Sequence, residues 1–256
     1  MRHLISHAQT HKGLVRKINE DACLDMAESG VWAVADGMGG HSAGDIASQL
    51  VVDTLRTSVS KSNSASVQSL TEALHQANAE LYRYSAQQLD GSTAGSTVVV
   101  LLIDKLHYHL LWAGDSRGYL LRNGRLRQIT RDHSQVNDMV DEGLLSSVDA
   151  ENHALANVIT RAVGVEEHIV IDVISGVWQP GDLFLLCSDG LNKELEDDEI
   201  GQYLQHTNLA EANRALLHST LVAGARDNVT CVIVKVSDDL TNVNYKDKTI
   251  PLYLKS

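Results

Sequence analysis

The chain has 256 residues, 43% hydrophobic and 21% charged, which is typical of a globular protein with one domain or two small ones. Its 33 acidic and 21 basic residues give a net charge of −12, which argues against nucleic acid or an anionic membrane as partner, because Lys and Arg drive phosphate binding. The sequence begins without a signal-like apolar segment, and no aliphatic run approaches the roughly 20 residues of a membrane helix. We therefore expect a cytoplasmic protein without membrane insertion, and a monomer.

Two amphipathic helices are predicted in the first third of the chain. The first begins after Ser42, which has the spacing of a capping box with Asp45, and its apolar stripe consists of Ala43, Ile46, Ala47, Leu50, Val51 and Leu55. A polar break follows over residues 58–66. A second stripe then begins with the pair Ser69 and Glu72 and consists of Leu70, Ala73, Leu74, Ala77 and Leu81.

The pattern changes to short strands after Gly95. Runs rich in branched residues predict strands over residues 96–103, 106–113, 118–122 and 126–129, and the Asn123-Gly124 pair predicts a hairpin turn. A short helix and a loop are expected within 132–157, strands over 169–177, 182–187 and 230–236, and helices over 197–206 and 210–222. Closely spaced strands in blocks separate from the helices indicate an α+β fold with antiparallel sheets.

Aspartates recur at the ends of the predicted strands. Asp36, Asp115 and Asp189 each follow an apolar run and adjoin a glycine, and Asp227 precedes the last strand. A carboxylate that emerges from a buried strand is costly unless a positive charge meets it. Oxygen ligands without accompanying His or Cys favour Mg²⁺ or Mn²⁺ over zinc or copper.

Other acidic and basic residues fit the same chemistry. Glu20 and Asp21 add two carboxylates, and Arg16, four residues before Glu20, would supply a guanidinium for phosphate oxygens. Two divalent ions held by shared carboxylates can hold a phosphate and lower the pKa of a water between them. The pattern therefore points to metal-assisted phosphate chemistry.

Five ordered motifs carry a family resemblance. They are RKINED (16–21), VADGMGGH (34–41), AGDSR (113–117), CSDGL (187–191) and DNVT (227–230). Together they resemble the metal-dependent PP2C/PPM protein Ser/Thr phosphatases in their compact bacterial form. The resemblance implies a four-layer α/β/β/α sandwich, with two central antiparallel sheets flanked by helix pairs. We expect residues 1–236 to form the catalytic domain and residues 237–256 to be a polar tail of unknown role.

The resemblance also assigns metal ligands. Asp36 would bridge two Mn²⁺ or Mg²⁺ ions, and Asp189 and Asp227 would complete one of the two sites. The Gly37 carbonyl, with Glu20 or Asp21, would serve the other site. Asp115 would lie near a third, weaker ion that shares Asp189.

Substrate contacts are implied as well. Arg16 matches the phosphate-binding arginine, and a flap over residues 146–164 would bring Arg161 to the substrate. Met38 stands where eukaryotic members place a histidine that is proposed to protonate the leaving group. His41 is a candidate for that role, and a metal-bound water is the alternative.

The implied activity is hydrolysis of phosphoserine and phosphothreonine in proteins by a hydroxide that bridges the two ions. Compact bacterial members often counteract a Ser/Thr kinase, and residues 188–194 resemble members of type VI secretion clusters. Two alternatives remain open. One is a catalytically silent pseudophosphatase that acts as a regulatory binding module, and the other is an unrelated metal-dependent phosphodiesterase or nuclease.

Overall fold

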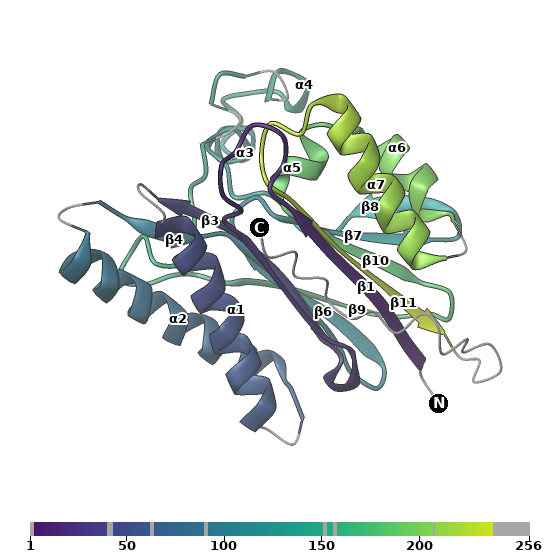
Figure 1. Cartoon of the computed structure of the whole chain (residues 1–256), viewed down its shortest axis with the longest axis horizontal. Coiled ribbons are helices and arrows are strands. Elements are labelled where there is room, and N and C mark those ends of the chain that lie inside the picture. The colour runs from purple at the N-terminus through teal and green to yellow at the C-terminus, as the bar shows by residue number, and fades with distance from the viewer. Residues whose placement is uncertain are drawn as a thin grey trace.

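Two antiparallel sheets form the centre of the computed structural model (Figure 1). The first has the order β1-β11-β10-β7-β8, with β1 His3–His11, β11 Val229–Ser237, β10 Leu183–Cys187, β7 Arg117–Arg122 and β8 Arg125–Gln128. The second has the order β2-β3-β5-β6-β9, with β2 Asp21–Met26, β3 Val31–Gly39, β5 Val98–Ile103, β6 His107–Ala113 and β9 Asp172–Val177. The short strand β4, Ala94–Ser96, pairs with the end of β3.

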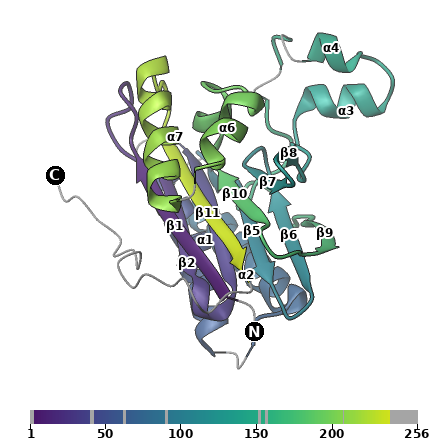
Figure 2. The ribbon, with the colours of Figure 1, turned by 90° about the vertical axis from the view of Figure 1, so that its right-hand side faces the viewer.

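Helices cover the outer faces of both sheets. Helices α1 (Ala43–Lys61) and α2 (Val67–Gln88) lie on the second sheet, and α6 (Asp197–Leu204) and α7 (Leu209–Ala223) lie on the first (Figure 1). The short helices α3 (Gln135–Asp141) and α4 (Ser147–Ala150) stand apart from the layers (Figure 2), and α5 (Asp189–Asn192) directly follows β10. A single 3₁₀ turn, Ala27–Ser29, joins β2 to β3. This confirms the expected α+β class and four-layer sandwich.

The inner strands, such as β3, β5 and β10, are apolar on both faces because each sheet is covered on both sides. Along β3, Val31 and Ala33 pack toward α1 and α2, whereas Trp32 and Val34 pack between the sheets. Successive side chains of a strand point to opposite faces. A strand that is covered on both faces therefore has a continuous run of apolar residues in its sequence. All six residues of β5 are buried for this reason.

The structure corrects three details of the predicted helices. Ile46 was expected in the buried stripe of α1 but is 42% exposed, and Val52 and Val59 are buried instead. Helix α1 also continues to Lys61, into the predicted polar break. Helix α2 begins earlier than predicted, because Ser66 and Ser69, rather than Ser69 and Glu72, form its capping box.

The structure describes residues 3–39, 43–61, 64–89, 92–150, 153–155, 158–206 and 208–237. Ser42, His41 and the predicted tail beyond residue 237 lie outside these ranges. Among the described helices, none has the length and apolar character that crossing a membrane requires.

Candidate active site

Acidic residues from both sheets meet at one end of the sandwich. Strands β3, β6 and β10 end there, and β2 and β11 begin there, because neighbouring strands are antiparallel. This edge carries the five predicted aspartates: Asp21, Asp36, Asp115, Asp189 and Asp227.

Asp21 links the two sheets. It lies directly opposite Asp36 in the β2–β3 register, and its Oδ2 accepts hydrogen bonds of 2.7 Å from the hydroxyl groups of Ser188 and Thr230. Ser188 follows β10 and Thr230 lies on β11, so both donors belong to the other sheet. Burial raises the pKa of Asp21 to about 7 from an ordinary 3.8, although the two hydroxyl groups act in the opposite direction.

Asp36 is at the centre of this cluster. Burial raises its pKa well above the ordinary value, and the carboxylates of Asp21, Asp189, Asp115 and Asp227 raise it further, in that order. Like charges disfavour the ionised form only over short distances, so the smaller contribution of these four carboxylates indicates that they lie near Asp36. A positive charge at this point would stabilise the ionised form of the whole cluster.

Gly37 permits a close approach of the backbone beside Asp36. A Cβ at this position would lie 1.9 Å from the carbonyl oxygen of Gly44 and 2.6 Å from that of Glu20. Only glycine therefore fits between the start of α1 and the start of β2. The Glu20 carboxylate accepts a hydrogen bond from the Gly44 backbone N–H, so it lies at the start of α1, where the helix dipole favours an anion.

Asp115 and Asp189 form the part of the cluster near α5. Burial, and after it the Asp189 carboxylate, raise the pKa of Asp115 to about 7. The Lys193 ammonium forms an ion pair with Asp189 Oδ2 one helical turn away. Burial alone would lower the pKa of Lys193, but Asp189, Asp115 and Asp36 raise it, so Lys193 stays charged. The sequence analysis did not predict this role of Lys193. Its spacing of four residues from Asp189, which places two residues side by side on a helix, could have indicated the ion pair.

Arg16 reaches the cluster through Asp227. Its Nη2 donates to Asp227 Oδ2 at 2.7 Å, and half of the Arg16 side chain remains exposed. The neighbouring Asn228 holds the segment that carries Arg16, because its Nδ2 donates to the carbonyl groups of Lys12 and Ile18 at 2.9 and 3.0 Å. The structural role of Asn228 was also missed, although it lies within the DNVT motif.

Three buried carboxylate oxygens of the cluster have no hydrogen-bond partner among the described residues: the Oδ1 atoms of Asp21, Asp115 and Asp189. Buried oxygens of this kind normally have a partner or bind a cation. Within the described ranges, no three His, Cys, Asp or Glu side chains are already grouped closely enough to hold a metal ion. The evidence that this cluster can bind metal is therefore the type of its donor atoms and these three oxygens. Carboxylate oxygens are hard donors, which suit Mn²⁺ or Mg²⁺.

Among the other predicted site residues, Arg161 pairs with an aspartate outside the cluster. His41 is outside the described residues. Arg161 pairs with Asp172 at the start of β9, with 2.9 Å between Nη1 and Oδ1, and the same nitrogen lies 3.3 Å from Nε2 of His133. The Nδ1 of His133 accepts the backbone N–H of Gly114 at 3.1 Å, so His133 connects Arg161 with the turn that presents Asp115.

Comparisons with known proteins show the family to which the chain belongs. The protein phosphatase 2C family model matches residues 9–222. The serine/threonine phosphatase stp of Listeria monocytogenes serotype 4b is 33% identical over 240 residues, which cover 90% of this chain and 95% of that protein. PppA, a key regulatory component of T6SS in Pseudomonas aeruginosa, is 43% identical with a TM-score of 0.82, covering 91% of this chain and 97% of that one.

A third relative contains metal. The catalytic domain of the serine/threonine protein phosphatase PstP, in complex with two manganese ions, is 35% identical with a TM-score of 0.84, covering 93% of this chain and all of that one. The family uses manganese or magnesium ions, which confirms the predicted cofactor type. With a match over most of its length to these bacterial phosphatases, the chain belongs to the protein phosphatase 2C family and is a metal-dependent serine/threonine protein phosphatase.

Proposed function

We propose that this phosphatase hydrolyses phosphoserine and phosphothreonine by direct attack of water on phosphorus, without a covalent phosphoenzyme. The observation that supports this most strongly is the meeting of five aspartates from two sheets. Three of them have a buried oxygen without a partner in the part of the chain that the structure describes. In that step the P–O bond to the new oxygen forms, the bond to the Ser or Thr oxygen breaks, and that oxygen takes up a proton.

The cluster would hold the metal ions as the family resemblance implies. Asp36 would be shared by two ions, Asp189 and Asp227 would belong to one, and the Gly37 carbonyl with Glu20 or Asp21 would belong to the other. When bound, such ions polarise the phosphate and lower the pKa of a water molecule. A third, weaker ion near Asp115 is part of the proposal, supported by the unpartnered Oδ1 of Asp115.

The protein's own residues orient the reactants. The hydroxyl groups of Ser188 and Thr230 fix Asp21 through Oδ2 and leave Oδ1 for another partner. Arg16 bonds Asp227 at the exposed edge of the cluster, and its planar guanidinium can grip two phosphate oxygens there. We propose Arg161 as a further substrate contact and His41 as the proton donor to the leaving oxygen.

The biological setting is also proposed. The likeness to PppA supports a role in regulating a type VI secretion system, opposite a bacterial Ser/Thr kinase that phosphorylates the same proteins. We propose that residues 1–236 act as one catalytic unit and that the enzyme works as a cytoplasmic monomer. The free thiols of Cys23, Cys187 and Cys231 suit a reducing compartment.

The test is phosphate release from a phosphothreonine peptide in the presence of Mn²⁺. Release should disappear with EDTA and in Asp36→Asn, which removes a charge from the centre of the cluster. The matched control Asp53→Asn makes the same chemical change on the exposed side of α1 and should keep full activity. Substantial activity in Asp36→Asn would show that the proposed site is wrong.

Leaving-group dependence tests His41 separately. Loss of a proton donor should slow hydrolysis of an alkyl phosphate more than that of an aryl phosphate, whose leaving group needs less protonation. Equal losses in His41→Ala on both substrates would remove His41 from that role.

A further inference from the structure

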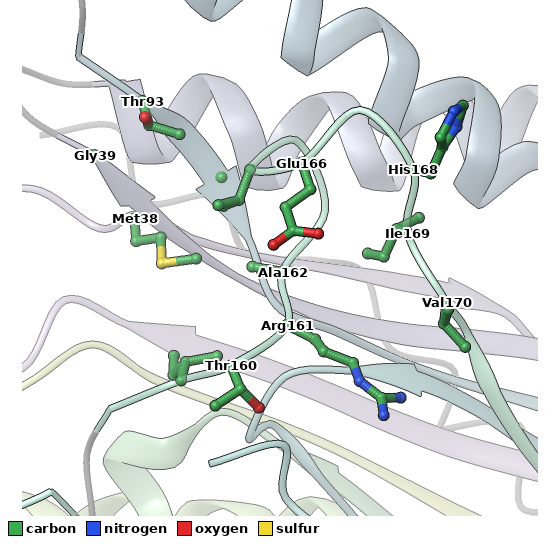
Figure 3. A pocket seen from close by; sticks show the side chains of 13 residues that line it. Met38, Gly39, Thr93, Thr160, Arg161, Ala162, Glu166, His168, Ile169 and Val170 are labelled. Atoms are coloured by element: carbon green, nitrogen blue, oxygen red, sulfur yellow. The ribbon is translucent and has the colours of Figure 1, made fainter. Parts of the chain in front are cut away.

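A pocket of about 660 Å³ adjoins the candidate active site at the end of β3. Met38 and Gly39, which follow Asp36 and Gly37 on that strand, form one wall. The loop before β9 lines the pocket with Glu166 and Ile169 (Figure 3), and Val165 of the same loop also lines it. The pocket therefore combines apolar side chains with polar ones, among them Thr160, Arg161 and His168, and it adjoins the strand that carries Asp36.

The loop that carries Glu166 is anchored from the core. Asn78 of α2, 2% exposed, donates through Nδ2 to the carbonyl groups of Glu166 and Glu167 at 2.9 and 3.1 Å. Its Oδ1 accepts the backbone N–H of Gly164 at 2.7 Å. These three bonds satisfy a buried amide and fix the loop, so the position of Glu166 is set by the fold.

Glu166 contributes a carboxylate to this pocket, which Arg161 and His168 also line. In Figure 3 its carboxylate points toward Met38 and Ala162, across the cavity. No hydrogen bond or ion pair to this carboxylate occurs among the described residues. Arg161, which also lines the pocket, points its guanidinium away from Glu166 and is paired with Asp172.

We propose that this pocket binds a Lys or Arg side chain of the phosphoprotein substrate, an inference that rests on the proposed phosphatase function. The aliphatic stem of such a side chain would pack on Met38, Val165 and Ile169, and its charged end would meet Glu166. The net charge of −12 also favours the approach of basic substrates, through long-range electrostatic attraction.

The position of the basic residue follows from the strand geometry. Met38 is two residues beyond Asp36, which is about 7 Å at roughly 3.3 Å per residue. An extended substrate has the same rise, so the Lys or Arg should stand about two or three residues from the phosphorylated Ser or Thr.

The experiment compares phosphothreonine peptides that differ at one position. Arg, norleucine or Glu is placed in turn at each position near the phosphothreonine, and kcat/KM is measured with Mn²⁺. Rates are expressed relative to each variant's own rate on p-nitrophenyl phosphate, which has no neighbouring residues. Wild type should prefer Arg to norleucine by about three- to five-fold at one position, the size expected for a partly exposed ion pair.

Variants identify the group responsible. Glu166→Gln should abolish the preference for Arg, and Glu166→Lys should transfer it to the peptide with Glu. Glu167→Gln is the matched control, since Glu167 is the neighbouring exposed glutamate and does not line the pocket, and it should keep the wild-type preference.

The following results would overturn the inference. Equal rates for norleucine and Arg would make the pocket a site for apolar residues, and equal effects of Glu166→Gln and Glu167→Gln would reduce the preference to overall charge. Failure to hydrolyse p-nitrophenyl phosphate would remove the proposed function and this inference together. Hydrolysis of that compound without a preference for Arg would remove this inference alone.

Discussion

Replacing Asp21 by Asn should make the metal-free protein more stable at alkaline pH. The Asn side chain has the shape of Asp, and its Oδ1 can accept the hydrogen bonds that Ser188 and Thr230 donate to one carboxylate oxygen. The substitution therefore keeps both contacts and removes one buried negative charge next to Asp36.

The magnitude follows from the pKa of Asp21, about 7 in the folded protein against an ordinary 3.8. Because a tenfold change in ionisation is worth about 1.4 kcal/mol, keeping this carboxylate charged costs up to about 4 kcal/mol above pH 7. A buried amide N–H without an acceptor can cost about 1–3 kcal/mol in return. We expect a net gain of about 2 kcal/mol in the free energy of unfolding.

The sign of the pH dependence is fixed by the direction of the pKa change. A carboxyl group with a raised folded pKa contributes stability that is complete below its unfolded pKa and is lost as pH rises through its folded pKa. For Asp21 the loss falls between about pH 4 and pH 7. The advantage of Asp21→Asn should therefore be present near pH 8 and nearly absent near pH 4.

Urea unfolding with EDTA, at about pH 8 and about pH 4, measures this difference. Added Mn²⁺ should stabilise wild type more than the variant, because the variant lacks one candidate ligand. Asp53→Asn, on the exposed side of α1, should change stability by less than about 0.5 kcal/mol. An Asp21→Asn protein that is no more stable than wild type near pH 8 would refute the electrostatic reasoning.

Three further substitutions test other parts of the site. Gly37→Ala should lower stability by about 3 kcal/mol in thermal unfolding, because its Cβ would lie 1.9 Å from the Gly44 carbonyl oxygen, whereas Gly124→Ala, with φ +75° and open space around it, should cost only about 1 kcal/mol. Comparable losses would contradict the close approach. Arg16→Lys should reduce kcat/KM on a phosphothreonine peptide by about tenfold, since Lys lacks the planar fork, and an unchanged value would remove Arg16 from phosphate binding. His133→Asn should retain more activity than His133→Gln, because Asn keeps an acceptor near Nδ1 for the Gly114 N–H that precedes Asp115. The reverse order of kcat/KM would assign the importance of His133 to its contacts with Asp172 and Arg161.

The inner strands of the sheets could be predicted from the sequence because they are buried on both faces. The continuous apolar run at residues 98–103 corresponds to all of β5. Helix starts were less predictable, since Ser66 and Ser69 are both suitable caps, and the contact of Ser66 with the Ser69 backbone decides between them. Whether Ile46 is buried depends on how α1 packs on β3. The sequence of α1 does not determine this, because apolar residues are available on more than one side of the helix.

The acidic cluster was visible in the sequence because each aspartate adjoins a strand, and antiparallel pairing brings those strand ends together. Contacts between distant segments carried no such signal. Asn78 and Glu166 are 88 residues apart, and neither belongs to a motif, yet their contact builds one wall of the pocket. Asn228 likewise joins the last strand to the segment before β2.

The high pKa values of the cluster link stability to metal binding. The fold groups Asp21, Asp36 and Asp115 although burial and mutual repulsion raise the pKa of each. Hydrophobic layers on both faces of each sheet offset that cost, so the strand ends stay together while the carboxylates are charged. A divalent ion removes the repulsion, and its stabilising effect should grow as the carboxylates ionise. The aspartates' mutual repulsion in the metal-free protein thus becomes a favourable contribution to metal affinity above neutral pH.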